Sequence, residues 1–470
     1  MAAGTHRPHG AAAGRTRGHR PGAGDALGGG WNRGLRVVST TDGPGPTLAV
    51  GRGHHRRSRA AMHPGLTARG QQGPPGIRAT LPLRVAVLCA ALAAACADAE
   101  PEPPPAPGEP LAGLNTGERG RFLVGRALFE RLATADEGLG PLYNGERCSD
   151  CHDQPVTGGS GIQRLRVLKA TRFEDGRCDL LRAVGGDNIQ RRATDLLKAH
   201  GMGPEEVPEA ATATALMTGP PLLGLGLLEA VPEAVLEEWA DPDDSDGDGI
   251  SGRLPRLADG RGARFGRKGD ASTVADFVDT ALRFELGFTT HLHPAEEPRN
   301  GTPVPPEADP MADPEIDART LGQITDFVRF LAPPAPEQEL SAAARDTVER
   351  GKALFSQIGC TSCHREELRT GESATAALAG RTLRPYSDML LHDLGEELAD
   401  VCGADAAPGE LRTAPLWGLR HRARLLHDGR AADIGGAVAA HGGEAESARE
   451  AFRSLPEEAR LAVIRFLRSL

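Results

Sequence analysis

Two five-residue segments combine thiols and an imidazole at the same spacing. CSDCH covers residues 148–152 and CTSCH covers residues 360–364. Covalent haem attachment needs two thiols on one turn, spaced to meet two vinyl groups, and an imidazole next in sequence to ligate the iron. A thiol-redox site would need one C-x-x-C beside a strand–helix unit, and a zinc site would need knuckles about 15–20 residues apart. Because Cys151 and Cys360 are 209 positions apart, the pattern predicts two covalent haems of the c type.

Each motif residue therefore has a predicted role. The thiols that hold the porphyrins are those of Cys148, Cys151, Cys360 and Cys363, and the proximal iron ligands are His152 and His364. Beyond the leader, the remaining cysteines are Cys178 and Cys402. An exported protein with two spare cysteines often bridges them. Two unpaired thiols are the alternative, and the sequence leaves both open.

The segments ahead of the motifs predict how they are positioned. Residues 116–132 and 341–360 both have the apolar spacing of an amphipathic helix. Both contain G-[RK]-A-L-F, beginning at Gly125 and Gly351, which indicates two related units. Residues 332–340 are Pro-rich and predict a hinge between them. With few clear strands in between, the expected class is mainly α with long loops.

The charge divides the chain in two. Residues 1–95 contain 13 Arg, no Lys and two acidic residues, a net charge of +11, so the total of −10 leaves −21 for residues 96–470. Phosphate backbones attract positive charge, so the acidic part is not expected to bind nucleic acid. Residues 1–61 are Gly/Ala/Arg-rich and indicate either a start codon placed too far upstream or a disordered basic leader.

Residues 62–95 predict a signal peptide, with a basic region, a short apolar core and a small-residue end. The end, LAAAC, resembles a lipobox, in which Cys96 becomes the lipid-bearing first residue; simple cleavage near Ala95 is the alternative. Residues 96–112 predict an acidic, Pro-rich tether. The expected location is the periplasm or the extracytoplasmic face of a membrane, held there by the lipid alone.

Three longer blocks carry a family resemblance. Residues 241–253 (DPDDSDGDGISGR), 386–400 (YSDMLLHDLGEELAD) and 412–445 resemble signature segments of the bacterial di-haem oxidoreductase family. That family is similar to the di-haem cytochrome c peroxidases, and its members are often labelled peroxidases or thiol oxidoreductases. The resemblance implies two cytochrome c-like haem domains with long loops, residues 113–335 with an inserted Asp-rich loop and residues 336–470.

The resemblance also implies an activity. A peroxidase of this type uses one six-coordinate haem to store electrons and a second haem with an open or releasable distal position. Its partners would be hydrogen peroxide and a periplasmic donor, either a small cytochrome c or a cupredoxin-type protein. The competing functions are a non-enzymatic electron-transfer lipoprotein and a di-haem oxidase that acts on a partner protein. Trp417 could relay holes between the haems or simply pack.

The distal iron ligands must come from outside the two motifs. No His or Met closely follows His152, so the first haem is expected to be open or to recruit a distant residue, from His200, Met202, Met217, His291 and His293. For the second haem the candidates are Met389, His392, His421, His427 and His441. In the related peroxidases the ligating methionine lies in a segment resembling A-V-x-x-M-G. Here that segment reads AVAAHGG, which favours His441; Met389, expected with His392 on a helix turn, is the second choice.

An Asp-rich loop predicts a calcium site. Asp244, Asp246 and Asp248 occupy positions 1, 3 and 5 of a D-x-D-x-D-G loop, with Gly249 at the turn. Pro255 stands where an EF-hand has its bidentate Glu, so the remaining ligands would have to come from elsewhere. A solvated acidic turn is the alternative.

Overall fold

The computed structural model describes residues 103–161 and 166–470. The predicted signal peptide, Cys96 and the start of the tether lie outside these residues. The α-helices are α2 (Thr116–Glu130), α3 (Asp195–Ala199), α4 (Leu225–Glu229), α5 (Glu233–Trp239), α6 (Val274–Leu286), α7 (Ala318–Phe330), α8 (Ala342–Gln357), α9 (Ile434–Ala439), α10 (Glu446–Ser454) and α11 (Glu457–Leu467). Within the described part of the chain, no helix combines the length and apolar character needed to cross a membrane.

The strands are short. They are β1 (Leu142–Tyr143), β2 (Val167–Glu174), β3 (Arg177–Asp179), β4 (Asn188–Ile189), β5 (Arg192–Ala193), β6 (Ala213–Met217), β7 (Leu368–Arg369), β8 (Thr382–Leu383), β9 (Leu391–Asp393) and β10 (Glu410–Arg412). β2 pairs antiparallel with β3, β4 and β6, and β1–β5, β7–β8 and β9–β10 form two-stranded antiparallel ribbons. The four-stranded sheet lies in the stretch where the sequence suggested few strands.

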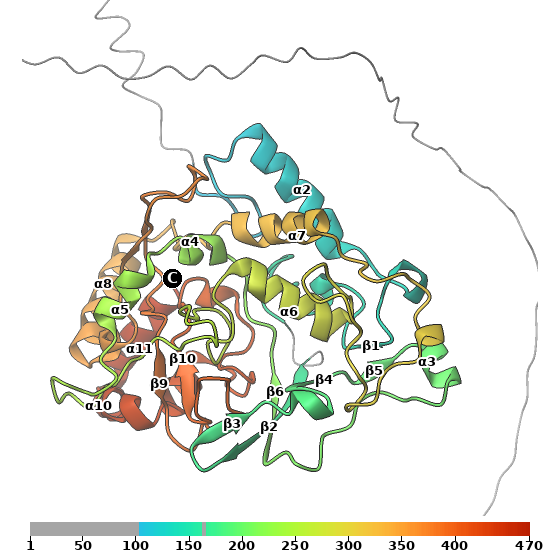
Figure 1. Ribbon diagram of the computed structural model, residues 1–470. Helices are drawn as coiled ribbons and strands as arrows, with labels where there is room; N and C mark the ends of the chain where they lie inside the picture. The colour runs from blue at the N-terminus through green and yellow to red at the C-terminus, as the bar shows by residue number, and fades with distance from the viewer. Residues whose placement is uncertain (1–102, 162–165) are drawn as a thin grey trace, which may run out of the picture. The chain divides into compact units, whose positions relative to one another are not determined.

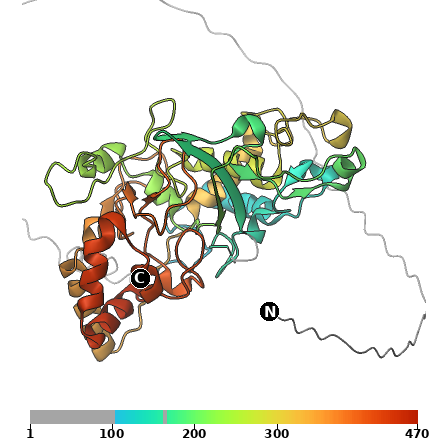
Figure 2. The same ribbon diagram turned by 90° about the horizontal axis from the view of Figure 1, so that it is seen from below.

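Two helix pairs repeat one packing geometry. α2 packs on α7, and α8 packs on α11; Figure 1 shows both pairs, and Figure 2 shows the second from another side. Gly125 of α2 lies so close to α7 that a Cβ there would be 2.8 Å from the Cβ of Phe327 and would overlap a backbone carbonyl. Gly351 of α8 meets Phe466 of α11 in the same way. The shared G-[RK]-A-L-F segment therefore supplies the close contact of each helix crossing.

The helix ends follow from local sequence. Asn115 caps α2, and its side chain and that of Glu118 exchange hydrogen bonds with each other's backbone N–H groups. Ser341 caps α8 through the N–H of Ala344. These caps begin the two helices within a residue or so of the starts that the sequence predicts.

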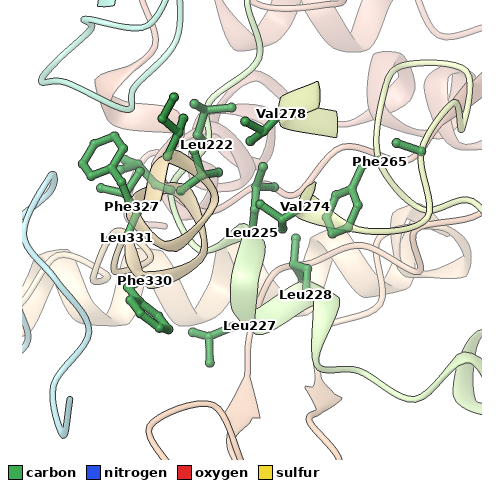
Figure 3. Packing of buried hydrophobic residues seen from close by; sticks show 14 of the residues in the cluster. Leu222, Leu225, Leu227, Leu228, Phe265, Val274, Val278, Phe327, Phe330 and Leu331 are labelled. Carbon is green, nitrogen blue, oxygen red and sulfur yellow. The ribbon is translucent and has the colours of Figure 1, made fainter. Parts of the chain in front are cut away.

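The helices build two main cores. The first contains α4, α6 and α7; Figure 3 shows Leu225, Val278 and Phe327 from these helices in one cluster. The second lies around α8 and α11 and includes Phe355 and Phe466. The first core also takes residues that follow the hinge, among them Leu368, Met389, Leu390 and Trp417.

Further links join the parts of the chain before and after the hinge. A disulfide connects Cys178 on β3 with Cys402, their Cα atoms 5.8 Å apart. The pairing of these cysteines, which the sequence left open, is therefore present. Thr218, just after β6, donates from its N–H and its hydroxyl to the carbonyl oxygen of His427, at 2.9 and 3.0 Å.

Candidate haem sites

The first motif lies on a short turn. Cys148 begins the 3₁₀ turn η2 (Cys148–Asp150), and the N–H of Cys151 donates to the Cys148 carbonyl at 3.2 Å. The next residue, His152, places Nδ1 3.2 Å from the carbonyl oxygen of Gly159. Its ring centroid is 6.2 Å from that of Phe129 at the end of α2. The helix ahead of the motif therefore holds its aromatic residue beside the imidazole.

The second motif repeats this arrangement. Cys360 begins the 3₁₀ turn η6 (Cys360–Ser362), and the N–H of His364 donates to the carbonyl oxygen of Cys360 at 3.0 Å. The Nδ1 atom of His364 lies 2.9 Å from the carbonyl oxygen of Tyr386. The ring centroid of Phe355, at the end of α8, is again 6.2 Å from that of the histidine.

Both imidazoles are neutral and oriented for metal ligation. Burial lowers the pKa of His152 and lowers that of His364 to about 4. In a neutral imidazole beside a carbonyl oxygen, the nearer nitrogen must carry the hydrogen, so Nδ1 donates and Nε2 keeps its lone pair. That tautomer, with Nδ1–H held by a carbonyl, is the usual state of a metal-binding histidine.

The four motif thiols suit covalent attachment better than redox exchange. They form no disulfide. Burial raises the pKa of Cys148, Cys151 and Cys360 to about 12, and it also raises that of Cys363. Thiol–disulfide exchange needs a thiolate, which these values oppose at neutral pH. The donor set of both motifs therefore fits a haem held by two thioether bonds and one imidazole.

His441 is the residue predicted as the distal ligand of the second haem. It lies just beyond α9, and its Nδ1 lies 2.7 Å from the carbonyl oxygen of Ala437. Burial lowers the pKa of His441, so this imidazole is also neutral, with Nε2 available. It lies within electrostatic range of His364. The predicted distal ligand thus lies within electrostatic range of the proximal one and is in the same tautomer.

The other candidates for the distal ligand of the second haem either form hydrogen bonds with carboxylates or are packed among other side chains. His392 lies between two carboxylates, with Nε2 3.0 Å from Asp388 and Nδ1 2.7 Å from Glu444. Although burial opposes its charge, the hydrogen bonds to Asp388, Cys363 and Glu444 raise the pKa of His392 to about 12. A cationic imidazole with both nitrogens engaged offers iron no lone pair.

Met389 is fully buried and packs in the first core, not in the cluster around α8, although the N–H of the preceding Asp388 donates to the carbonyl of Cys363 at 3.0 Å. Its φ is +64°, so the expected helix turn through Met389 and His392 is wrong. The Ser387 hydroxyl accepts from the N–H of Met389, and the Asp388 carboxylate accepts from that of Leu390. Such side-chain bonds compete with helix formation. Of the other candidates, His427 lies 2.7 Å from Asp400, and His421 lines a small pocket beside Trp417.

Most candidates for the distal ligand of the first haem are exposed or pack in other parts of the protein. His200, His291 and His293 are exposed, and His293 lies 2.9 Å from Asp279. Met202 packs beside Leu197 in a small cluster around α3. Met217 is buried at the end of β6. A Cβ built on Gly219, two residues later, would lie 3.3 Å from the His152 ring.

Comparison with known proteins identifies the family. Residues 209–470 match the model of a family described as "Di-haem oxidoreductase, putative peroxidase". The chain belongs to this family. The match contains the second motif and begins after the first. None of the curated proteins compared with the chain matches it.

Three solved structures are similar to this di-haem oxidoreductase. One is the hydrazine synthase of Kuenenia stuttgartiensis, at 13% identity and a TM-score of 0.35, covering 85% of this chain and 100% of that one. A MauG-like protein associated with microbial copper homeostasis has 15% identity and a TM-score of 0.34, covering 79% and 94%. A variant of the dihaem peroxidase BthA from Burkholderia thailandensis has 15% identity and a TM-score of 0.36, covering 75% and 85%.

Family membership makes the chain an oxidoreductase and implies two haem cofactors. The structure also brings to the first motif two residues that the sequence did not single out. Glu285, near the end of α6, lies within electrostatic range of Cys148 and Cys151, and Arg267 lies within range of His152. Asn188 donates to Oε1 of Glu285 at 2.7 Å, whereas the buried Oε2 has no partner among the described residues. Burial raises the pKa of Glu285.

The Asp-rich loop brings its three carboxylates together. Single oxygens of Asp244, Asp246 and Asp248 lie within 4.8 Å of one another. Just after them, the Ser251 hydroxyl donates to Oε1 of Glu444 at 2.9 Å. Since the other oxygen of Glu444 lies 2.7 Å from His392, a chain of polar contacts joins this loop to the second motif.

Proposed function

We propose that this di-haem oxidoreductase is an exported, peroxidase-like enzyme with one covalent haem at each C-x-x-C-H motif. The observation that carries the proposal is the repeated site: two thiols on one 3₁₀ turn, a neutral imidazole with Nε2 available, and a phenylalanine at the same centroid distance. The residues that would hold the haems are Cys148, Cys151, His152, Cys360, Cys363 and His364.

The two haem-binding units would be the predicted domains, residues 113–335 and 336–470. The repeated helix crossing at Gly125 and Gly351 supports this division, because each motif follows one member of a glycine-contacted helix pair. The first unit would carry the four-stranded sheet and the Asp-rich loop as its insertion. We assign a calcium ion to Asp244, Asp246 and Asp248, since three converging carboxylates favour a hard cation.

The two sites would divide the work. His441 would close the second site as the sixth ligand of a haem there, and the site would then serve electron storage and not substrate binding. The first site would stay open to substrate, because its nearby residues offer charge and protons rather than a second imidazole. When bound, haem iron supplies one-electron transfer and a position at which peroxide binds.

Residues of the chain would supply the protons that peroxide reduction consumes. Reducing one hydrogen peroxide to two water molecules consumes two electrons and two protons. Because burial raises the pKa of Glu285, this carboxyl would be the proton donor to the first site. Arg267 would place a positive charge beside the same site.

The electrons would come from a periplasmic protein, a small cytochrome c or a cupredoxin-type donor. The predicted signal peptide and the Cys178–Cys402 disulfide both support export, because disulfides persist in oxidising compartments. A lipid on Cys96 would anchor the protein to a membrane.

One observation favours the electron-transfer lipoprotein as a second candidate. Trp417 is buried and lines the same small pocket as Gln154 and Ser160, which follow His152, and as His421 and Arg422. It therefore lies between the first motif and the part of the chain that follows the second. An indole there could pass charge without any substrate chemistry.

Peroxide turnover by the haem-loaded protein separates these functions. With a reduced donor, Glu285→Gln should lower the rate of peroxide consumption about 10²–10⁴-fold, as expected for loss of a general acid. Glu205→Gln, at a buried carboxyl that bonds the N–H of Gln190, is the matched control and should keep the rate. If both haems are low-spin in every redox state and peroxide leaves the spectrum unchanged, the protein is an electron carrier.

A further inference from the structure

Three half-buried arginines from different segments lie within electrostatic range of one another. Arg412 ends β10, and its N–H donates to the carbonyl of Arg267 at 2.9 Å. Its Nε also donates to the carbonyl of Gly266, at 2.9 Å. Arg422 follows the 3₁₀ turn η7 (Leu419–His421) and donates to the carbonyl of Pro415 at 2.8 Å. Each of the three lies within electrostatic range of the other two.

These arginines have no carboxylate partners. None of the three forms an ion pair within the part of the chain that the structure describes, and the buried Nε of Arg267 has no acceptor there. Burial lowers the pKa of each to about 10. By contrast, nearby Arg253 is paired with Glu410 at 2.6 Å and with Asp405 at 3.3 Å.

Asp428 lies within electrostatic range of Arg267, and Asp270 and Asp388 lie within range of Arg412, but none of these carboxylates forms an ion pair with the cluster. Like charges held together with little solvent and no direct ion pair are unfavourable, so such a cluster favours an anion supplied from outside the polypeptide. The location indicates which anion. Arg267 is within electrostatic range of His152. Arg412 is within range of Asp388, whose N–H donates to the carbonyl of Cys363 at 3.0 Å. The cluster is thus within electrostatic range of the first motif's histidine and of a residue hydrogen-bonded to the second motif.

We propose that Arg267, Arg412 and Arg422 form a shared carboxylate-binding site that takes propionate groups of the two haems. This inference rests on the proposed function, in that both motifs must carry haem. Guanidinium groups bind carboxylates through paired N–H donors, and they remain charged when buried. A covalently attached haem keeps its carboxylates in place permanently, which suits a buried cluster better than an exchanging anion does.

The test uses the haem-loaded protein, two glutamine variants of the cluster, one lysine variant that restores the charge, and one control variant outside the cluster. Arg267→Gln is the first, since the Arg267 side chain makes no hydrogen bond that holds the described fold together. Arg422→Gln is the second, with Arg422→Lys to restore the charge. Arg264→Gln is the matched control, because Arg264 is buried but bonds the carbonyl of Val231 at 2.5 Å, outside the cluster. Haem content, reduction potentials and the propionate vibrations in resonance Raman spectra are measured without peroxide.

Arg267→Gln and Arg422→Gln should both keep their haem and shift the propionate vibrations. Each should also lower the reduction potential of at least one haem, because a lost positive charge disfavours the reduced form. At a fixed applied potential, the reduced-to-oxidised ratio should fall about tenfold, equivalent to about 59 mV for one electron. Arg422→Lys should recover most of the change, and Arg264→Gln should show none.

Two outcomes overturn the inference. In the first, haem is present but the potentials and propionate vibrations match the wild type in both glutamine variants. In the second, added acetate or phosphate gives a saturable spectral change that Arg267→Gln abolishes while the propionate vibrations stay constant; the cluster then binds a free anion. Wild-type protein without covalent haem would instead refute the proposed function, which keeps the two failures distinct.

Discussion

The helix crossing ahead of the first motif provides a matched pair of glycine substitutions. α2 contains Gly120 and Gly125. A Cβ at Gly125 would overlap the backbone of α7 and lie 2.8 Å from the Cβ of Phe327, whereas a Cβ at Gly120 would meet no atom within 4 Å. We therefore expect Gly125→Ala to destabilise the protein and Gly120→Ala to stabilise it.

The magnitudes follow from two opposing effects. Replacing an exposed helical glycine with alanine stabilises a helix by roughly 0.5–1 kcal/mol, which is the whole effect expected at Gly120. At Gly125 the same gain is set against overpacking, which typically costs about 1–3 kcal/mol and more when backbone atoms must move. Because the nearest atoms belong to the α7 backbone, we expect a net loss of roughly 2 kcal/mol. The α2–α7 spacing also sets Phe129 beside His152, so the first haem's absorption should shift in this variant alone.

Thermal unfolding of the haem-loaded variants measures the difference. Gly125→Ala should lower Tm by roughly 4–8 °C and Gly120→Ala should raise it by roughly 1–4 °C. Gly322→Ala, at an open position of α7, is a second control that should behave like Gly120→Ala. Shifts of the same sign and size at Gly120 and Gly125 would refute the close crossing.

Three further predictions concern the rest of the molecule. Replacing Cys178 and Cys402 with serine should lower the free energy of unfolding by about 2–5 kcal/mol in chemical denaturation; no change would mean that the bridge is absent in solution. His441→Ala should convert one haem from low to high spin in absorption spectra, whereas Met389→Ala should keep both spin states; the reverse result would make Met389 the ligand. Burial and neighbouring carboxylates raise the pKa of Glu296 to about 9, so its contribution to stability is present below pH ~4.5 and lost as the pH rises toward 9. Glu296→Gln should therefore match the wild-type free energy of unfolding at pH 5 and exceed it at pH 9 by ~2 kcal/mol in chemical denaturation, a figure discounted for partial exposure; an equal gain at both pH values would contradict the assignment.

The helices that position the motifs could be predicted because their signals are local. Residues 116–132 and 341–360 show apolar periodicity, and α2 and α8 form within them. In both helices the glycine of the repeated G-[RK]-A-L-F segment lies at the close helix crossing, whereas the division into two related units stays a prediction. The partners in those crossings, α7 and α11, could not be assigned, because their contacts join residues about 100 or more positions apart.

The sheet and the loop at Met389 show where local reading fails. β2 pairs with β6 more than 40 positions later, and its burial does not alternate cleanly, so it lacks the pattern of a half-exposed strand. The three-residue spacing of Met389 and His392 suggested a helix turn, but the Ser387 and Asp388 side chains accept hydrogen bonds from the N–H groups of Met389 and Leu390, Met389 has a φ of +64°, and His392 lies in β9.

Glu285 and Arg267 show a different limit. Each stands in a segment that reads as ordinary, an amphipathic helix for Glu285 and a Gly/Lys/Asp turn for Arg267. Their importance comes from buried polar atoms with no partner among the described residues, a property of the folded chain. Both charged residues of a salt bridge within a protein are present in the sequence, so a sequence pattern can suggest the pair. When a charged residue is paired with a cofactor, only that residue is in the sequence. Such a residue is recognised from the structure, as an arginine with little solvent exposure and no ion pair with a carboxylate.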